Sequence, residues 1–263
     1  MSQPKKGTPK TRLLYYEDAY LKEFDAEVSE IKEVVDRYSV ILDQTAFYPA
    51  GGGQPADTGV IRGKRGEATI LDVQMANGTV VHVAHGIEGK LGAGEQVKGS
   101  VDWDRRYALM KNHTAAHLMA ETLRRVTGTP LKIIGSAIGV EKARLDFAYE
   151  KSLGPLLPKI EEEANSIVGQ NQFVEVKVMK RKEAEDHLKR FHEDLEILPR
   201  QVQNIRIVEV KDLHACACGG THVRKTSEIG TVKILRRRSK GKGVERIEFV
   251  AKSREAEQMH VLR

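Results

Sequence analysis

The chain of 263 residues has little cysteine, few aromatic residues and no long apolar run. It has 2 cysteines, a single tryptophan and 5% aromatic residues in all. No stretch approaches the roughly 18 consecutive apolar residues that a membrane helix requires, so no membrane partner is expected. The two cysteines, Cys216 and Cys218, are separated by one residue. This spacing disfavours a disulfide between them and favours a metal ligand or a free thiol.

Charge is plentiful. The chain is 30% charged and 40% hydrophobic, with a formal net charge of +6 and a pI near 9.2, which favours a polyanionic partner. Positive charge is concentrated in three runs, at residues 4–12, 180–182 and 236–242. With so few aromatics, such runs suit phosphate contacts better than base stacking. Residues 1–12 are polar and basic without an apolar signal core, so a cytoplasmic protein is expected.

The first part of the chain is predicted to be a small β-barrel. Glycine recurs throughout it, and strands are expected at residues 34–42 and 97–102. Residues 69–75 and 79–84 flank Asn77-Gly78, a dipeptide that strongly favours a hairpin turn. The first domain is therefore predicted to comprise residues 1–102.

The pattern of the sequence changes at Trp103, where helical spacing follows the short strands, and residues 103–263 are predicted to form an α+β domain. Asp104 is a candidate N-cap for a helix over residues 105–126, which ends before Gly128 and Pro130. Residues 134–147 alternate as a strand does. The remaining expected elements are helices at 155–168 and 182–191, and strands at 173–179, 205–210, 230–235 and 244–251.

Two short motifs carry the chemistry, His113-Thr-Ala-Ala-His117 and Cys218-Gly-Gly-Thr-His222. On a helix, the first two imidazoles emerge on one face, about one turn apart. The glycines of the second motif let the backbone turn so that thiolate and imidazole reach one ion. Each motif alone has a structural alternative, but together the four side chains form the mixed nitrogen and sulfur set that suits tetrahedral zinc. One zinc ion per chain is expected.

Two neighbouring residues offer alternative ligands. His214 and Cys216 lie just before the second motif, but a tetrahedral ion needs only four ligands. Cys218 is preferred over Cys216 because it completes the Cys-Gly-Gly-Thr-His pattern.

In order and spacing, these motifs resemble the free-standing alanyl-tRNA editing proteins of the AlaX type, in their medium-length form, and the editing domain of alanyl-tRNA synthetase. The resemblance extends over nearly the whole chain and includes residues 14–18, 43–49, 51–59, 135–136 and 144–147 as well as the two metal motifs. It implies an N-terminal β-barrel and the α+β domain shared with threonyl- and alanyl-tRNA synthetases. The family's zinc ligands map onto His113, His117, Cys218 and His222.

The resemblance also implies an activity, the hydrolysis in trans of tRNA(Ala) mischarged with serine and possibly glycine. The length argues against a complete synthetase. No phosphate loop of the G-x-x-x-x-G-K type is present, and ATP is not expected as a partner. A catalytically silent, zinc-stabilised tRNA-binding module and a zinc hydrolase for a small ester or D-amino acid derivative stay open as alternatives.

No catalytic residue is assigned, but several side chains are predicted to contact the substrate. Gly51, Gly52 and Gly53 allow close approach of backbone to a ligand, and Gln54 adds an amide; the family's corresponding loop faces the editing pocket. Thr45 and Ser136 are further candidates, each with a purely structural alternative. Synthetase editing domains usually carry a polar residue two positions before the Gly-Ser pair, where this chain has Ile133. The preference between serine and glycine is therefore left open.

Overall fold

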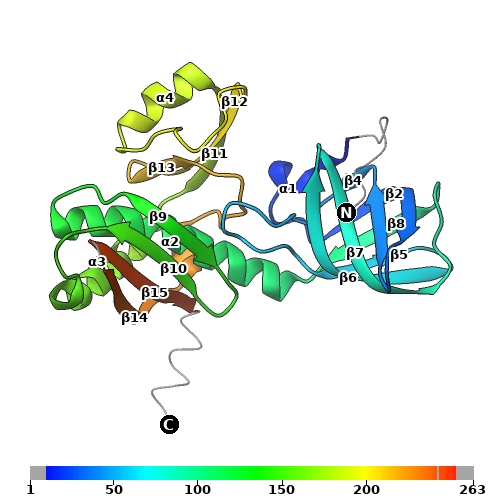
Figure 1. The fold of residues 1–263 in the computed structure, drawn as a ribbon, viewed down its shortest axis with the longest axis horizontal. Coiled ribbons are helices and arrows are strands. Elements are labelled where there is room, and N and C mark those ends of the chain that lie inside the picture. Colours follow the sequence, from blue (N-terminus) through cyan, green and yellow to red (C-terminus); the bar gives the residue numbers. More distant parts are fainter. Residues whose placement is uncertain (1–9, 242, 253–263) are drawn as a thin grey trace, which may run out of the picture. The chain divides into compact units, whose positions relative to one another are not determined.

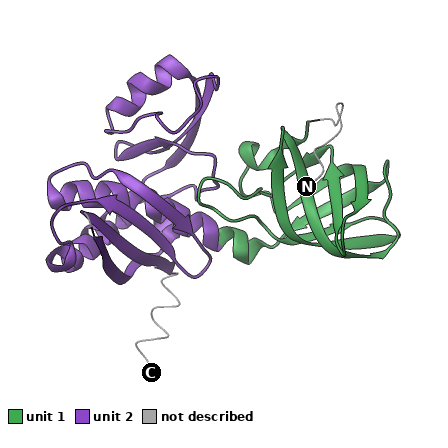
Figure 2. Cartoon of the chain, in the orientation of Figure 1, with its two compact units in different colours: residues 1–107 green, residues 108–263 purple. Residues whose placement is uncertain are grey.

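The computed structural model describes residues 10–241 and 243–252 and divides the chain into two compact units, residues 1–107 and 108–263 (Figure 2). The division falls within one helix, α2 (Trp103–Thr127). Residues 4–9 of the first basic run and Lys242 of the third lie outside the described residues. Among the described helices, none is both long and apolar enough to cross a membrane.

Unit 1 contains the predicted barrel, which is closed and antiparallel in the strand order β2-β3-β7-β6-β5-β8 (Figure 1). Alternate side chains of each strand point inward, as Phe24, Ala26 and Val28 do from β2. The strands are β2 (Glu23–Glu33), β3 (Tyr38–Leu42), β5 (Gly59–Arg62), β6 (Gly66–Ala76), β7 (Thr79–Gly89) and β8 (Gln96–Val101). A short parallel pair, β1 (Arg12–Leu13) and β4 (Gln44–Thr45), and the single-turn helix α1 (Leu14–Glu17) complete the unit.

Of two barrel turns, one agrees with the prediction made from the sequence and the other differs from it. Asn77 and Gly78 have φ of 52° and 83° and connect β6 to β7, which confirms the hairpin. The strand predicted at residues 34–42 begins only at Tyr38, because Val35 (φ 38°) and Asp36 (φ 58°) form the turn between β2 and β3. Aspartate tolerates the left-handed region, but the β-branched Val35 favours a strand, and this explains the error.

The helix α2 begins where Asp102 caps it. The Asp102 carboxylate accepts a hydrogen bond from the Arg105 backbone N–H at 3.2 Å, and its carbonyl accepts from Arg106 N–H at 3.0 Å. The N-cap prediction of Asp104 is therefore wrong, and Asp104 lies in the first turn. Farther along α2, in unit 2, the side-chain amide of Asn112 donates hydrogen bonds to the backbone carbonyls of Gly139 and Val140.

Unit 2 contains two antiparallel sheets. The larger has the strand order β14-β15-β10-β9, and the helix α3 (Leu157–Gly169) is tied to it by Asn165, whose amide bonds both the N–H and the carbonyl of Val232. Residues 134–147, predicted as one alternating stretch, form two strands separated by a turn. The elements are β9 (Ile133–Ile138), β10 (Ala143–Ala148), β14 (Thr231–Gly241), β15 (Val244–Lys252) and the 3-10 helices η1 (Gly154–Leu156) and η2 (Thr226–Ile229).

The smaller sheet, ordered β11-β12-β13, leads the chain into the cysteine motif. It consists of β11 (Val174–Lys180), β12 (Asn204–Val210) and β13 (His214–Ala217). The helix α4 (Arg181–Lys189) covers one face, where Leu188 packs with Ile205 and Ile207 in a separate apolar cluster. The α+β class and the barrel are thus confirmed. The predicted division at residues 102 and 103 stays a prediction.

Candidate metal centre

The helix α2 supplies the first two candidate metal ligands. His113 and His117 lie four residues apart, so both emerge on the same face, with ring centroids 5.3 Å apart. Their exposed fractions are only 5% and 7%. Two buried imidazoles on one helix face need polar or metal partners to offset their desolvation.

The loop after β13 supplies the other two candidate ligands, Cys218 and His222, and is held to β12 by Arg206. The backbone N–H of Cys218 donates to the Arg206 carbonyl at 3.1 Å, and Arg206 Nη1 donates to the Cys218 carbonyl at 2.5 Å. The backbone N–H of Gly220 donates to Cys218 Sγ at 3.4 Å. These contacts fix the direction of the thiol before any ion is bound.

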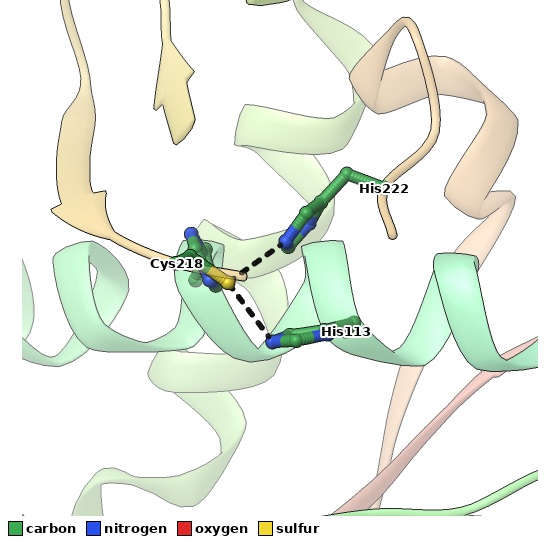
Figure 3. Close-up of side chains that lie close together, drawn as sticks. His113, Cys218 and His222 are labelled. Carbon is green, nitrogen blue, oxygen red and sulfur yellow. Dashed lines mark hydrogen bonds between the residues drawn. The ribbon is translucent and has the colours of Figure 1, made fainter. Parts of the chain in front are cut away.

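The four side chains converge. Cys218 Sγ lies 3.6 Å from His113 Nε2 and 3.3 Å from His222 Nε2 (Figure 3). The ring of His222 lies 4.3 Å from that of His113 and 4.5 Å from that of His117, centroid to centroid. One ligand atom from each of the four residues lies within 4.8 Å of all the others, so the group can hold a metal ion.

Burial keeps these imidazoles neutral. Desolvation, with a smaller contribution from the Arg206 charge, lowers the pKa of His113 to about 4. Desolvation first, and neighbouring cationic groups second, place the pKa values of His117 and His222 well below the usual value. Neutral imidazoles carry the lone pair that a metal ion needs. Burial also raises the pKa of the Cys218 thiol, so binding of a cation must displace its proton.

Thr114 sets the orientation of His222. Its hydroxyl donates to the Met110 carbonyl at 3.0 Å, so it must accept at its 3.1 Å contact with His222 Nδ1. It also accepts from the backbone N–H of Val223 at 3.2 Å. With the proton held at Nδ1, the lone pair of His222 is at Nε2, the atom that faces Cys218.

We expect Thr114→Val to weaken metal binding by about 10- to 100-fold, the effect usual for loss of a group that orients a ligating histidine. Competitive titration against a chelator measures the affinity. Thr114→Ser is the matched control because it keeps the hydroxyl. Equal affinity for Thr114→Val and the parent protein would show that the loop alone orients His222.

The predicted glycine loop forms a tight turn in unit 1. Gly51 N–H donates to the Gln54 carbonyl at 3.0 Å, and Gln54 N–H donates to the Gly51 carbonyl at 2.9 Å. Gly52 (φ 56°) and Gly53 (φ 81°) occupy the two central positions, a conformation that glycine adopts without strain. The three glycines are exposed, whereas Gln54 is buried. The turn therefore presents bare backbone to solvent.

Thr45 is fully buried in β4 of unit 1, and its hydroxyl is engaged. His82 Nδ1 donates to the Val40 carbonyl at 2.9 Å, so Nε2 accepts the Thr45 hydroxyl at 2.8 Å. The Thr45 oxygen also accepts from Phe47 N–H at 3.1 Å. These bonds give Thr45 a structural function within unit 1, and its role in substrate binding stays a prediction.

Ser136 lies in β9, the edge strand of the larger sheet in unit 2, opposite Leu145. Its side chain is exposed, as is that of Ile133, the position at which synthetase editing domains usually carry a polar residue. An exposed hydroxyl on an edge strand is accessible to a ligand, and its role also stays a prediction.

Three residues with prominent structural contacts were not identified from the sequence. Thr114 and Arg206 bond to the candidate ligands His222 and Cys218, and Arg106 is wholly buried in unit 1 against Asp57. Thr114 stands inside the first motif, so its position beside His113 was an available signal. The contacts of the two arginines depend on tertiary structure and left no local pattern.

Comparisons with known proteins agree with this arrangement. A family model for class II (A) tRNA synthetases matches residues 5–105, and one for the second additional domain of threonyl and alanyl tRNA synthetases matches residues 205–248. The chain is 39% identical over 243 residues to the alanyl-tRNA editing protein AlaX-M of Methanosarcina barkeri, a match that covers 91% of this chain and 98% of that protein. The chain belongs to the AlaX-M family of alanyl-tRNA editing proteins.

A second AlaX-M protein matches over the same extent, whereas a ligase matches over only part of its length. The AlaX-M protein of Methanosarcina acetivorans is 38% identical, with 91% of this chain and 98% of the relative covered. The alanine–tRNA ligase of Ignicoccus hospitalis is 41% identical over 96% of this chain, but the match covers only 27% of the ligase. The chain thus spans nearly all of an AlaX-M protein and about a quarter of the ligase.

Proposed function

We propose that His113, His117, Cys218 and His222 bind one zinc ion per chain. In a tetrahedral site with zinc–sulfur and zinc–nitrogen distances near 2.3 and 2.05 Å, sulfur and nitrogen lie about 3.6 Å apart. The observed separations of 3.6 and 3.3 Å agree with this spacing. Three imidazoles and one thiolate are also a donor set that suits zinc.

We further propose that the chain is a trans-editing deacylase that hydrolyses tRNA(Ala) mischarged with serine, with glycine as a second candidate substrate that the test below decides. The observation that carries this proposal is the convergence of the four ligands in a chain that matches AlaX-M proteins over nearly their whole length. The basic composition fits a tRNA partner. The cytoplasmic location inferred from the sequence stays a prediction.

The reaction requires water to attack the ester between the amino acid and the terminal ribose. Zinc, when bound, supplies a Lewis acid that polarises or positions the substrate. Thr114 and Gly220 hold two of its ligands in place, which keeps the site ready without rearrangement. The exposed backbone of Gly52 and Gly53 and the hydroxyl of Ser136 are our candidates for direct substrate contact.

Selectivity must come from the serine hydroxyl. Alanine is smaller than serine, so exclusion by size cannot protect correctly charged tRNA. A site whose polar groups are left unpaired without that hydroxyl can discriminate by ~10⁴ or more. We therefore expect Ser-tRNA(Ala) to be hydrolysed and Ala-tRNA(Ala) to be spared.

The test is to incubate the zinc-loaded protein with tRNA(Ala) charged with serine, glycine or alanine and to measure loss of each ester. Release of serine with retention of alanine supports the proposal, and the glycine arm decides whether glycine is also a substrate. Binding of all three tRNAs without acceleration of hydrolysis would identify the silent tRNA-binding module instead. Hydrolysis of small amino acid esters with no effect on any charged tRNA would favour the small-molecule hydrolase.

Binding of tRNA is expected to involve the exposed arginines of β14. Arg237 is paired with Glu245, whereas Arg236 and Arg238 are exposed on the same edge strand. We expect Arg236→Gln/Arg238→Gln to weaken binding and to reduce the slope of log K against log salt by about 0.7 to 0.9 for each phosphate that the variant no longer neutralises.

Lys151→Gln/Lys159→Gln is the matched control for charge, since both lysines are exposed and lie outside the basic runs. Binding by filter retention or anisotropy at several salt concentrations provides the slope. The same slope in both double variants would place the tRNA away from β14.

A further inference from the structure

A second group of metal-competent side chains lies beside the first. His117, His214 and Cys216 each offer a ligand atom within 4.8 Å of the other two. Cys216 Sγ lies 3.7 Å from each ring nitrogen of His117, close to the about 3.6 Å expected between sulfur and nitrogen ligands of one tetrahedral ion. His117 is the member that the two groups share.

The fold creates this group through strand alternation. His214 and Cys216 are two residues apart in β13, so both side chains point to the same face of the smaller sheet. Their cross-strand neighbours in β12 are Val210 and Val208, both buried. The ring of His214 meets that of His117 edge to face, with centroids 5.5 Å apart and an interplanar angle of 84°. Two imidazoles and a thiol thus converge beside the buried side chains of Val208 and Val210.

We propose that His117, His214 and Cys216 form a second binding position for a thiophilic d10 cation such as Zn²⁺ or Cd²⁺. A neutral imidazole has one lone-pair nitrogen, so His117 serves one ion at a time and the two positions are alternatives. The first position supplies four ligands and is the tighter. The second supplies three, which leaves one coordination position open to water or another ligand. This inference concerns metal binding alone and holds whether or not the chain is a deacylase.

Cobalt(II) titration of Cys218→Ser tests the proposal. The chain has only two cysteines, so in this variant a thiolate-to-cobalt charge-transfer absorption in the near ultraviolet reports Cys216 alone. We expect the band to appear on saturation, with an affinity at least tenfold below that of the parent protein. Absence of the band at saturating cobalt would overturn the proposal.

Two matched double variants decide which imidazoles accompany Cys216. His113→Ala/Cys218→Ser removes a residue of the first position only, and we expect the band to persist within about twofold of the Cys218→Ser affinity. His214→Ala/Cys218→Ser removes a residue of the second position only, and we expect the affinity to fall tenfold or more. The opposite result would mean that Cys216 replaces Cys218 in the first position, and would overturn the proposal.

A measurement on Cys218→Ser itself covers the case in which a double variant does not fold. Couplings between bound ¹¹³Cd and imidazole ring protons identify the ligating histidines directly. Couplings to His117 and His214 support the second position. Couplings to His113 and His222 contradict it.

Discussion

Replacement of Cys218 by alanine is expected to remove the tightly bound zinc. The parent protein should retain about one zinc per chain after dialysis, and Cys218→Ala close to none, because the thiolate is the one anionic ligand of the four-residue site. Elemental analysis of dialysed protein measures the content. Loss of the ion should also abolish hydrolysis of Ser-tRNA(Ala).

Cys216→Ala is the control for this experiment. Cys216 belongs to the three-residue group and not to the four-residue group, so this variant should keep its zinc. Retention of zinc in Cys218→Ala together with its loss in Cys216→Ala would contradict the ligand assignment. The dialysis buffer contains a chelator whose affinity lies between those of the two positions, so that an ion at the weaker second position is removed.

Arg106→Ala is expected to destabilise unit 1 by about 3–5 kcal/mol, the range for removal of one partner of a buried ion pair. Arg106 and Asp57 both have fully buried side chains, and Arg106 also donates to the backbone carbonyls of Ala19 and Ala46. The substitution would leave the Asp57 carboxylate buried without its cation. Trp103, the single tryptophan, lies in unit 1, so its fluorescence during urea unfolding reports this unit.

Arg62→Ala provides the comparison. Arg62 forms an ion pair with Glu67 on the barrel surface, with 66% of the arginine side chain exposed. Exposed pairs of this kind contribute about 0–1 kcal/mol, so Arg62→Ala should change stability little. A similar small change for Arg106→Ala would show that Asp57 finds other partners when the arginine is absent.

The elements with strong local signals could be predicted from the sequence. The Asn77-Gly78 hairpin follows from the turn that this dipeptide favours, and α2 follows from its apolar spacing. The four metal ligands could be proposed because each pair is close in sequence and its residue types suit zinc. In these cases the information lies within a few consecutive residues.

Features that depend on distant residues could not be predicted in this way. Thr45 has a barrel partner, His82, that lies 37 positions away, so nothing near Thr45 shows that its hydroxyl is engaged. The hydrogen bonds between Arg206 and Cys218 require β12 and β13 to pair, and the bond between His222 and Thr114 requires the cysteine loop to reach α2. The sequence predicts Asp104 as the N-cap because Asp102 ends the strand expected at residues 97–102, and only the hydrogen bond from Arg105 N–H to the Asp102 carboxylate shows that Asp102 caps the helix.

The distribution of the metal ligands along the chain has a consequence for biosynthesis. His113 and His117 can form their half of the site as soon as α2 folds, but Cys218 follows His113 by 105 residues. At about 5–20 residues per second, the ribosome needs roughly 5 to 20 s to supply it. During that interval a nascent chain offers only two imidazoles, too few for tight binding. On the proposed ligand assignment, metal loading is therefore a late step of folding, and a chain truncated before residue 218 lacks two of the four ligands.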